Sequence, residues 1–145
     1  MLTDTNTSLE NLSGKTIMIL GASILQLPAI EKAVEMGLKV VALDMNPDAV
    51  GFNVPGVEKE FISTIDIDAA VEAAKRYEID GVMTLATDLP MRVVAAVARE
   101  CNLVGISEET AIKATDKSVM REALRIGNVP IPKFFKVSKD RKSVV

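Results

Sequence analysis

The stretch Lys15–Asp44, KTIMILGASILQLPAIEKAVEMGLKVVALD, decides the fold class of this chain. It opens with a short apolar run that stops at Gly21, as a buried strand does. Aliphatic residues then recur at the spacing of a helix, and Lys39–Leu43 is a second apolar run. Pro28 in the first turn and Gly37 after the last turn mark the ends of this helix. Strand, helix and strand with short links predict two parallel strands joined by a helical crossover.

The same alternation continues along the rest of the chain. The expected strands are Lys15–Leu20, Lys39–Leu43, Glu60–Ile62, Gly81–Leu85 and Leu103–Gly105. Acidic and hydroxyl residues stand where the later helices would begin, and these residues are expected to cap them. The expected caps are Asp66 or Asp68, Asp88, Ser107 and Asp116. The pattern predicts an α/β fold, a Rossmann-like, open, doubly wound parallel sheet of about five strands, followed by the start of a second domain.

Three segments follow from this pattern. Residues 1–14 are rich in polar side chains and are expected to form a disordered leader. Residues 15–115 are expected to form the Rossmann-like domain. Residues 116–145 carry a helix and an expected strand at Lys133–Val137, with which a second domain would begin. Because the chain stops at Val145, we expect that second domain to be truncated and the parent gene to continue.

The composition excludes several classes of function. The chain has no histidine and one cysteine, so it holds no Ser-His-Asp or Cys-His catalytic set and no histidine or thiolate metal site. Cys101 falls on the apolar face of an expected helix, which favours buried packing. A net charge of -3 without a basic stripe argues against nucleic acid. No signal peptide or membrane-spanning run is recognisable, so we expect a cytoplasmic protein without a membrane partner.

The carboxyl ends of the expected strands meet at one edge of the sheet, where doubly wound folds bind ligands. Gly21–Gln26 joins the first strand to its helix at this edge and keeps only the first glycine of the dinucleotide fingerprint. Ser23 and Gln26 stand where the second and third glycines would allow close approach of a pyrophosphate. A small-molecule role and a plain strand-to-helix turn are therefore about equally supported, and NAD is less favoured.

Other polar residues at this edge have two interpretations each. Asp44 ends the second strand, where an acid can bind ribose hydroxyls, but Asp44-Met45-Asn46-Pro47 also builds its own turn. Asp88 is first a helix cap and second a carboxylate for an amine or hydroxyl, and Thr87 is a turn residue or a ligand contact. Spacing alone gives Lys117 no role beyond that of a solvated lysine.

Two ordered groups of residues resemble the landmarks of a known superfamily. The first group is Gly21-x-x-x-Leu25-Gln26-x-Pro28-Ala29-Ile30, followed by Gly37-x-x-Val40-Val41-Ala42-x-Asp44-x-Asn46-Pro47. The second group is Ala114-Thr115-Asp116-Lys117 to Met120-Arg121, followed by Gly127-Asn128-Val129-Pro130-Ile131-Pro132-Lys133-Phe134. In order and spacing, the chain from Lys15 to about Val137 resembles the opening of ATP-grasp ligases. The purine-biosynthesis members and those like the carbamoyl-phosphate synthetase large subunit are the nearest in pattern.

This resemblance implies a pre-ATP-grasp domain that helps to bind the acceptor substrate of a C–N bond-forming ligase. Such enzymes activate a carboxylate as an acyl phosphate, which an amine then attacks. The residues implied at the acceptor are Gly21, Ser23, Leu25, Gln26, Asp44, Thr87 and Asp88. Lys117 matches a basic residue that contacts ATP phosphates. No catalytic residue and no metal ligand is assigned within this chain, since both lie in the family's downstream domain.

The implied partners are therefore a small-molecule acceptor and an ATP-grasp domain, in cis or on another chain, with a homodimer left open. ATP and magnesium belong to the full-length parent, and neither is expected to bind tightly to these residues alone. The loop lacks the doubled glycines of many relatives, and Leu85-Ala86-Thr87-Asp88 does not match the better-known members. Two alternatives stay open: a small NAD(P)-binding Rossmann domain, and a metabolite-binding regulatory domain that stands alone.

Overall fold

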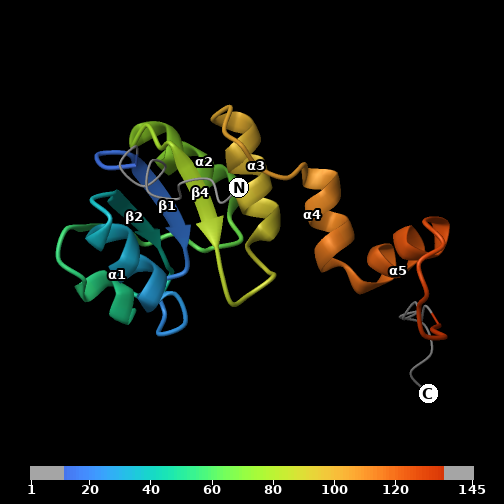
Figure 1. Cartoon of the computed structure of the whole chain (residues 1–145). Helices are drawn as coiled ribbons and strands as arrows, with labels where there is room; N and C mark the ends of the chain where they lie inside the picture. Colours follow the sequence, from blue (N-terminus) through green and yellow to red (C-terminus); the bar gives the residue numbers. More distant parts are fainter. Residues whose placement is uncertain (1–11, 136–145) are drawn as a thin grey trace, which may run out of the picture.

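The computed structural model describes residues 12–135, in which strands and helices alternate (Figure 1). The elements are β1 (Thr16–Leu20), α1 (Leu27–Glu35), β2 (Lys39–Leu43), the short 3-10 helix η1 (Val50–Asn53), β3 (Val57–Glu60), α2 (Ile67–Arg76), β4 (Gly81–Thr84), α3 (Met91–Glu100), α4 (Glu108–Thr115) and α5 (Lys117–Ile126). No helix in this part of the chain is long and apolar enough to span a lipid bilayer.

The strands form one parallel sheet in the order β3-β2-β1-β4. Ile17 of β1 lies beside Val40 on one side and Gly81 on the other. From β1 the chain runs to β2 and β3 on one side, and it then crosses to β4 on the other side of β1. The strand order therefore reverses at β1, and a crevice opens there. The predicted Rossmann-like α/β fold is confirmed, with four strands in the sheet rather than about five.

The expected fifth strand at Leu103–Gly105 was wrong, because this segment ends a helix. The amide of Leu103 donates to the carbonyl of Ala98 at 2.7 Å, and Asn102 adopts a left-handed conformation with φ 57°. This geometry ends α3, and the amide of Leu103 is used by the helix end and is not available to a neighbouring strand. Val104 follows with its side chain in solvent.

Two other strand predictions need correction. The third strand is Val57–Glu60 instead of Glu60–Ile62, because Val57 is the residue that turns into the core and Phe61 leaves the sheet. The Phe61 ring instead packs edge-on against Phe52, with ring centroids 5.5 Å apart. Of the strand expected at Lys133–Val137, residues 133–135 are irregular, and the remainder lies outside the described residues.

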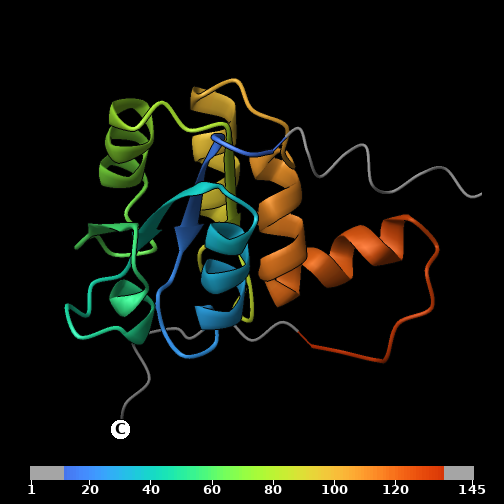
Figure 2. The same cartoon turned by 60° about the vertical axis from the view of Figure 1, so that its left-hand side comes forward.

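Side chains alternate between two apolar layers, one on each face of the sheet. In β1, Ile19 joins α1 and η1, whereas Met18 and Leu20 join α2 and α3. In β2, Val40 and Val41 are divided in the same way. The views in Figure 1 and Figure 2 show α1 on one face of the sheet and α2 and α3 on the other. Strands buried on both faces explain why the apolar runs are continuous.

The predicted helix caps are confirmed at three positions and wrong at one. Asp66, Ser107 and Asp116 each accept hydrogen bonds from backbone amides in the first turn of α2, α4 and α5. Asp88 caps nothing, because α3 begins after Pro90, whose carbonyl accepts the first helical hydrogen bond from Val94 at 2.9 Å. Proline has a φ already suited to a helix start, which moves the start beyond the reach of Asp88.

The later helices lead away from the sheet. α3 packs against the sheet through Val93, Val94 and Val97, its other buried residues are alanines, and it also contacts α4. Ala98 lies so close to Gly105 that a Cβ added to the glycine would stand 2.7 Å from the alanine Cβ.

α5 packs mainly on α4, and none of its residues is buried. Figure 1 shows α5 beyond α4, away from the sheet. The guanidinium of Arg121 on α5 lies over the Phe134 ring, 5.4 Å from its centroid. Cys101 ends α3, half-buried against the core, and this burial raises the pKa of its thiol.

Candidate functional site

A cleft of about 260 Å³ opens at the carboxyl ends of β1 and β2. It lies where the strand order reverses, which is the position expected for a ligand in this type of sheet. Its lining residues are Leu20, Gly21, Ser23, Leu25, Gln26, Asp44, Met45, Thr64, Thr87 and Pro90. Six of the residues predicted at the acceptor therefore lie together, and Asp88 lines a neighbouring cavity instead.

The loop from β1 to α1 uses its backbone amides internally. Gly21, with φ 99°, donates to the carbonyl of Leu43 at 2.7 Å. The amide of Ala22 donates to a carboxylate oxygen of Asp44 at 2.9 Å, and the amide of Leu25 donates to Ser23 Oγ at 3.2 Å. Dinucleotide-binding loops leave such amides free for a pyrophosphate. This loop is therefore not set up to hold a phosphate.

Gln26 completes this arrangement from beneath the loop. Its side chain is 3% exposed, and its Oε1 accepts from the amide of Ser23 at 3.2 Å and from Ser23 Oγ at 2.6 Å. Its Nε2 donates to the carbonyl of Leu85 at 2.7 Å, in the loop after β4. The side chain thus joins the two loops that form the cleft and fills the space that a glycine would leave for a pyrophosphate. A Cβ added to Gly21 would stand 2.9 Å from Gln26 Cδ, so glycine also suits the first position.

Asp44 has the turn role that the sequence favours, and it also holds the neighbouring loop. One carboxylate oxygen accepts from Ala22, and the other accepts from the amide of Asn46 at 2.9 Å. Asn46 Oδ1 in turn accepts from the amide of Asp48 at 3.0 Å. Asp44 is half-buried at the wall of the cleft. A contact between Asp44 and a ligand stays a prediction.

The cleft combines an apolar rim with little charge. Leu25 and Met45 are 58% and 71% exposed at its edge. Thr64 and Thr87 contribute hydroxyl groups, and Asp44 is the one charged residue among the lining residues that the structure describes. No described lysine or arginine faces the space. These features suit an uncharged or cationic group with apolar parts better than a phosphate ester.

Asp88 lies in a second cavity, of about 490 Å³, beside the first. The lining residues of this second cavity are Ile65, Ile67, Asp88, Leu89, Arg92, Val93 and Thr115. Arg92 was not predicted as a site residue, because it lies in the first turn of a helix and the residues predicted at the acceptor lie in loops. Its position just after the loop that follows the fourth expected strand was the available signal.

The residues implied for ATP and metal do not form a site in the described part of the chain. Lys117 is exposed at the start of α5 and lines neither cavity. Within residues 12–135, no group of three or more acidic, cysteine or histidine side chains could hold a metal ion. The described residues thus do not fit magnesium and ATP by themselves, and no step through them is assigned here.

Comparisons with solved structures agree with the fold. No family model and no curated protein matches the sequence. Phosphoribosylglycinamide synthetase from Anaerococcus prevotii is 30% identical over 80% of this chain and 30% of that chain, with a TM-score of 0.72. L-amino acid ligase from Bacillus licheniformis is 25% identical over 88% and 36% of the two chains, with a TM-score of 0.66. N5-carboxyaminoimidazole ribonucleotide synthetase from Thermotoga maritima shares the fold at 23% identity, 87% and 34% coverage and a TM-score of 0.67.

The class of protein defined by this fold and cleft is a Rossmann-like domain with its ligand edge at β1. The three solved structures described above are ATP-grasp ligases, and the match agrees with their N-terminal, pre-ATP-grasp domain. The chain spans about a third of the length of these enzymes. None of the three is a carbamoyl-phosphate synthetase, so that part of the resemblance stays a prediction.

Proposed function

We propose that residues 15–115 form the acceptor-binding domain of an ATP-dependent carboxylate–amine ligase. The observation that carries the proposal is the cleft at the carboxyl edge of the sheet, in a chain 30% identical over 80% of its length to a synthetase of this superfamily. The ATP-grasp domain, in cis or on another chain, would supply ATP, magnesium and the acyl phosphate. The role of this domain is to hold the nucleophile in position, which lowers the entropic cost of the reaction.

The structure of the first loop argues against the dinucleotide alternative. An NAD(P)-binding domain needs free amides at the start of its first helix and room for the pyrophosphate. Here Asp44 and Gln26 occupy the amides of Ala22 and Ser23, and the Gln26 side chain fills the space. We therefore expect calorimetric titration with NAD and NADP to show no specific binding. A dissociation constant in the low micromolar range would favour the dinucleotide alternative.

The test of the acceptor role uses the protein together with the ATP-grasp region that its gene or a neighbouring gene encodes. Acceptor-dependent ADP release is measured across a panel of amines and amino acids. In Thr87→Trp, the indole should fill the cleft and raise the KM for the acceptor about tenfold, with the KM for ATP changed less than about twofold. Thr110→Trp, an exposed position on α4 outside the cleft, is the matched control.

Two results would contradict the proposal. The first is an unchanged acceptor KM in a folded Thr87→Trp protein, which would place the acceptor elsewhere. The second is the absence of any ATP-grasp region from the gene and its neighbours. That result would favour the alternative of a metabolite-binding regulatory domain.

A further inference from the structure

The cavity that holds Asp88 lies on the opposite side of the β4–α3 loop from the acceptor cleft. Thr64 and Thr87 line the cleft, whereas their chain neighbours Ile65 and Asp88 line the second cavity. At about 490 Å³, the cavity has the size of sites that bind small molecules. α4 closes its far side through Thr115.

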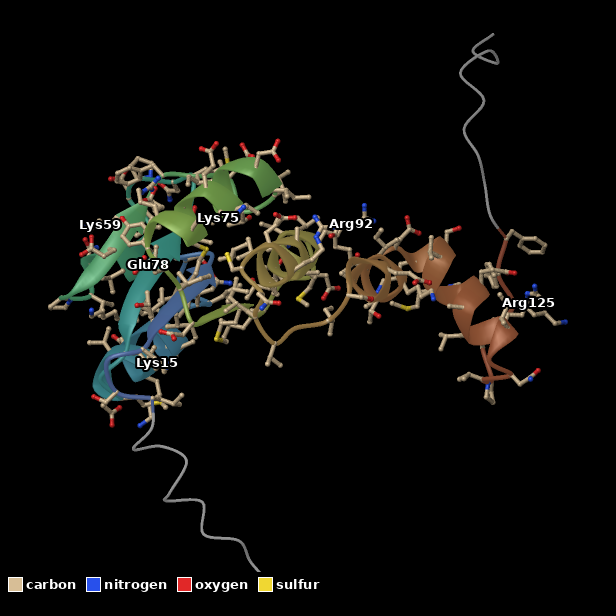
Figure 3. The ribbon with its side chains drawn as sticks, turned by 90° about the horizontal axis from the view of Figure 1, so that it is seen from above. Lys15, Lys59, Lys75, Glu78, Arg92 and Arg125 are labelled. Carbon is tan, nitrogen blue, oxygen red and sulfur yellow. The ribbon has the colours of Figure 1, made fainter. Side chains whose placement is uncertain are left out.

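Asp88 and Arg92 bring opposite charges to this cavity without pairing. Asp88 lies in the loop before α3 and Arg92 in the first turn of the helix, and both side chains are exposed at the cavity wall. Neither side chain makes a hydrogen bond or an ion pair with any described residue. At the other end of α3, by contrast, Arg99 pairs with Glu100 and with Glu108 of α4. Figure 3 shows Arg92 at the side of α3 that faces α4.

The rest of the cavity wall is apolar. Ile65 and Leu89 are 62% and 74% exposed there, and Val93 forms the buried floor. The hydroxyl of Thr115 already donates to the carbonyl of Ala111 at 2.8 Å, so it adds no free donor. A ligand that matches this wall has an aliphatic part together with one negative and one positive group.

From these observations we infer that the cavity binds a zwitterionic α-amino acid with an aliphatic side chain. Arg92 would hold the carboxylate, because a guanidinium offers paired donors to both carboxylate oxygens. Asp88 would accept hydrogen bonds from the ammonium group. The aliphatic side chain would cover Ile65, Leu89 and Val93, which are otherwise exposed to water or open to the cavity. The inference does not depend on the proposed function, because that function concerns the neighbouring acceptor cleft.

The test measures binding to the 145-residue chain by two-dimensional amide NMR, which also reports whether each variant is folded. The probe is L-leucine, compared with 4-methylpentanoate, 3-methylbutylamine and glycine, which lack the amine, the carboxylate and the side chain, respectively. We expect leucine to shift amide signals around residues 88–93 and to saturate. Each of the three analogues should bind at least about tenfold more weakly.

Substitutions then separate the site from general effects of charge. Arg92→Gln and Asp88→Asn should each weaken leucine binding about tenfold or more, and Arg92→Lys should fall between wild type and Arg92→Gln. Lys59→Gln and Asp48→Asn are matched controls. They remove one charge each at exposed positions away from the cavity, and they should bind leucine as wild type does.

The outcomes distinguish this inference from the proposed function. A dissociation constant for leucine weaker than about 10 mM, or equal binding by wild type and both cavity variants, would overturn the amino acid site. Ligase activity with a different acceptor would then still support the proposed function. If leucine binding depends on Arg92 and Asp88, but the protein together with its ATP-grasp region shows no acceptor-dependent ADP release, the site is supported and the proposed function is contradicted.

Discussion

Replacing Gln26 by alanine should destabilise the protein although Gln26 lies on a loop. The substitution removes the donor to the carbonyl of Leu85 and the acceptor for the amide and hydroxyl of Ser23. The side chain is 3% exposed, so water does not readily take its place. The substitution also removes the side-chain atoms that pack against Gly21 and leaves a small cavity.

The expected cost follows from these contacts. The partly buried carbonyl of Leu85, left without its partner, costs at most about 1–3 kcal/mol, and the partly exposed Ser23 groups add less because water can reach them. Together with the cavity, we expect a loss of about 2–3 kcal/mol in the free energy of unfolding. That is a large part of the typical total of about 5–15 kcal/mol for a domain.

Urea denaturation followed by circular dichroism measures this loss. With a slope of about 1.5 kcal/mol per molar urea, the midpoint should fall by about 1.3–2 M. Ile24→Ala is the control, since this side chain of the same loop is 66% exposed and should change stability by less than about 0.5 kcal/mol. If Gln26→Ala is as stable as Ile24→Ala, the side chain does not join the two loops in the way described.

Three further outcomes are expected. Val97→Asp should cost several kcal/mol in urea denaturation, because Val97 is fully buried between α3 and the sheet, and full tolerance would contradict that packing. Asp66→Ala should cost about 1 kcal/mol as the loss of a helix cap, whereas Asp88→Ala should cost less than about 0.5 kcal/mol, and equal losses would restore Asp88 as a cap. Lys15 and a backbone amide hold the pKa of Asp80 below its usual value. The stability from Asp80 is thus present above its unfolded pKa of about 4 and is lost as the pH falls through the lower folded pKa. As the pH is lowered, the free energy of unfolding of wild type should therefore approach that of Asp80→Asn. A difference between the two proteins that stays constant at all pH values would exclude this linkage.

The sequence was sufficient for the elements that are buried on both faces. The run at Lys39–Leu43 is β2 at the expected residues, and the first strand begins one residue later than expected and ends at Leu20 as expected. β3 was harder, because it lies at the edge of the sheet and two of its four residues, Glu58 and Lys59, are exposed. Its apolar signal is correspondingly weak. The segment at Leu103 has a strand-like composition, but the hydrogen bonds that end α3 decide its conformation, and these depend on the Asn102 backbone.

The location of the candidate site was more predictable than the roles of its residues. Parallel topology alone places the loops after β1, β2 and β4 at one edge, so six predicted residues lie at one cleft. Which groups remain free for a ligand depends on hydrogen bonds between distant residues, such as Gln26 with Leu85, 59 residues apart. Local spacing does not reveal such pairs. Pro90 in the sequence does indicate where α3 begins, and a helix that begins after Pro90 does not need Asp88 as its cap.

The contact between Ala98 and Gly105 has a consequence for how this sequence can diverge. Neither position has room for growth, since a methyl group on Gly105 would approach the Ala98 Cβ to 2.7 Å. A homologue can carry alanine at position 105 if glycine replaces Ala98, and the glycine inside the helix then costs about 1 kcal/mol in stability. The two positions should therefore covary as a pair with constant summed volume. Such covariation would record the close approach of α3 and the start of α4 in sequences whose structures are unknown.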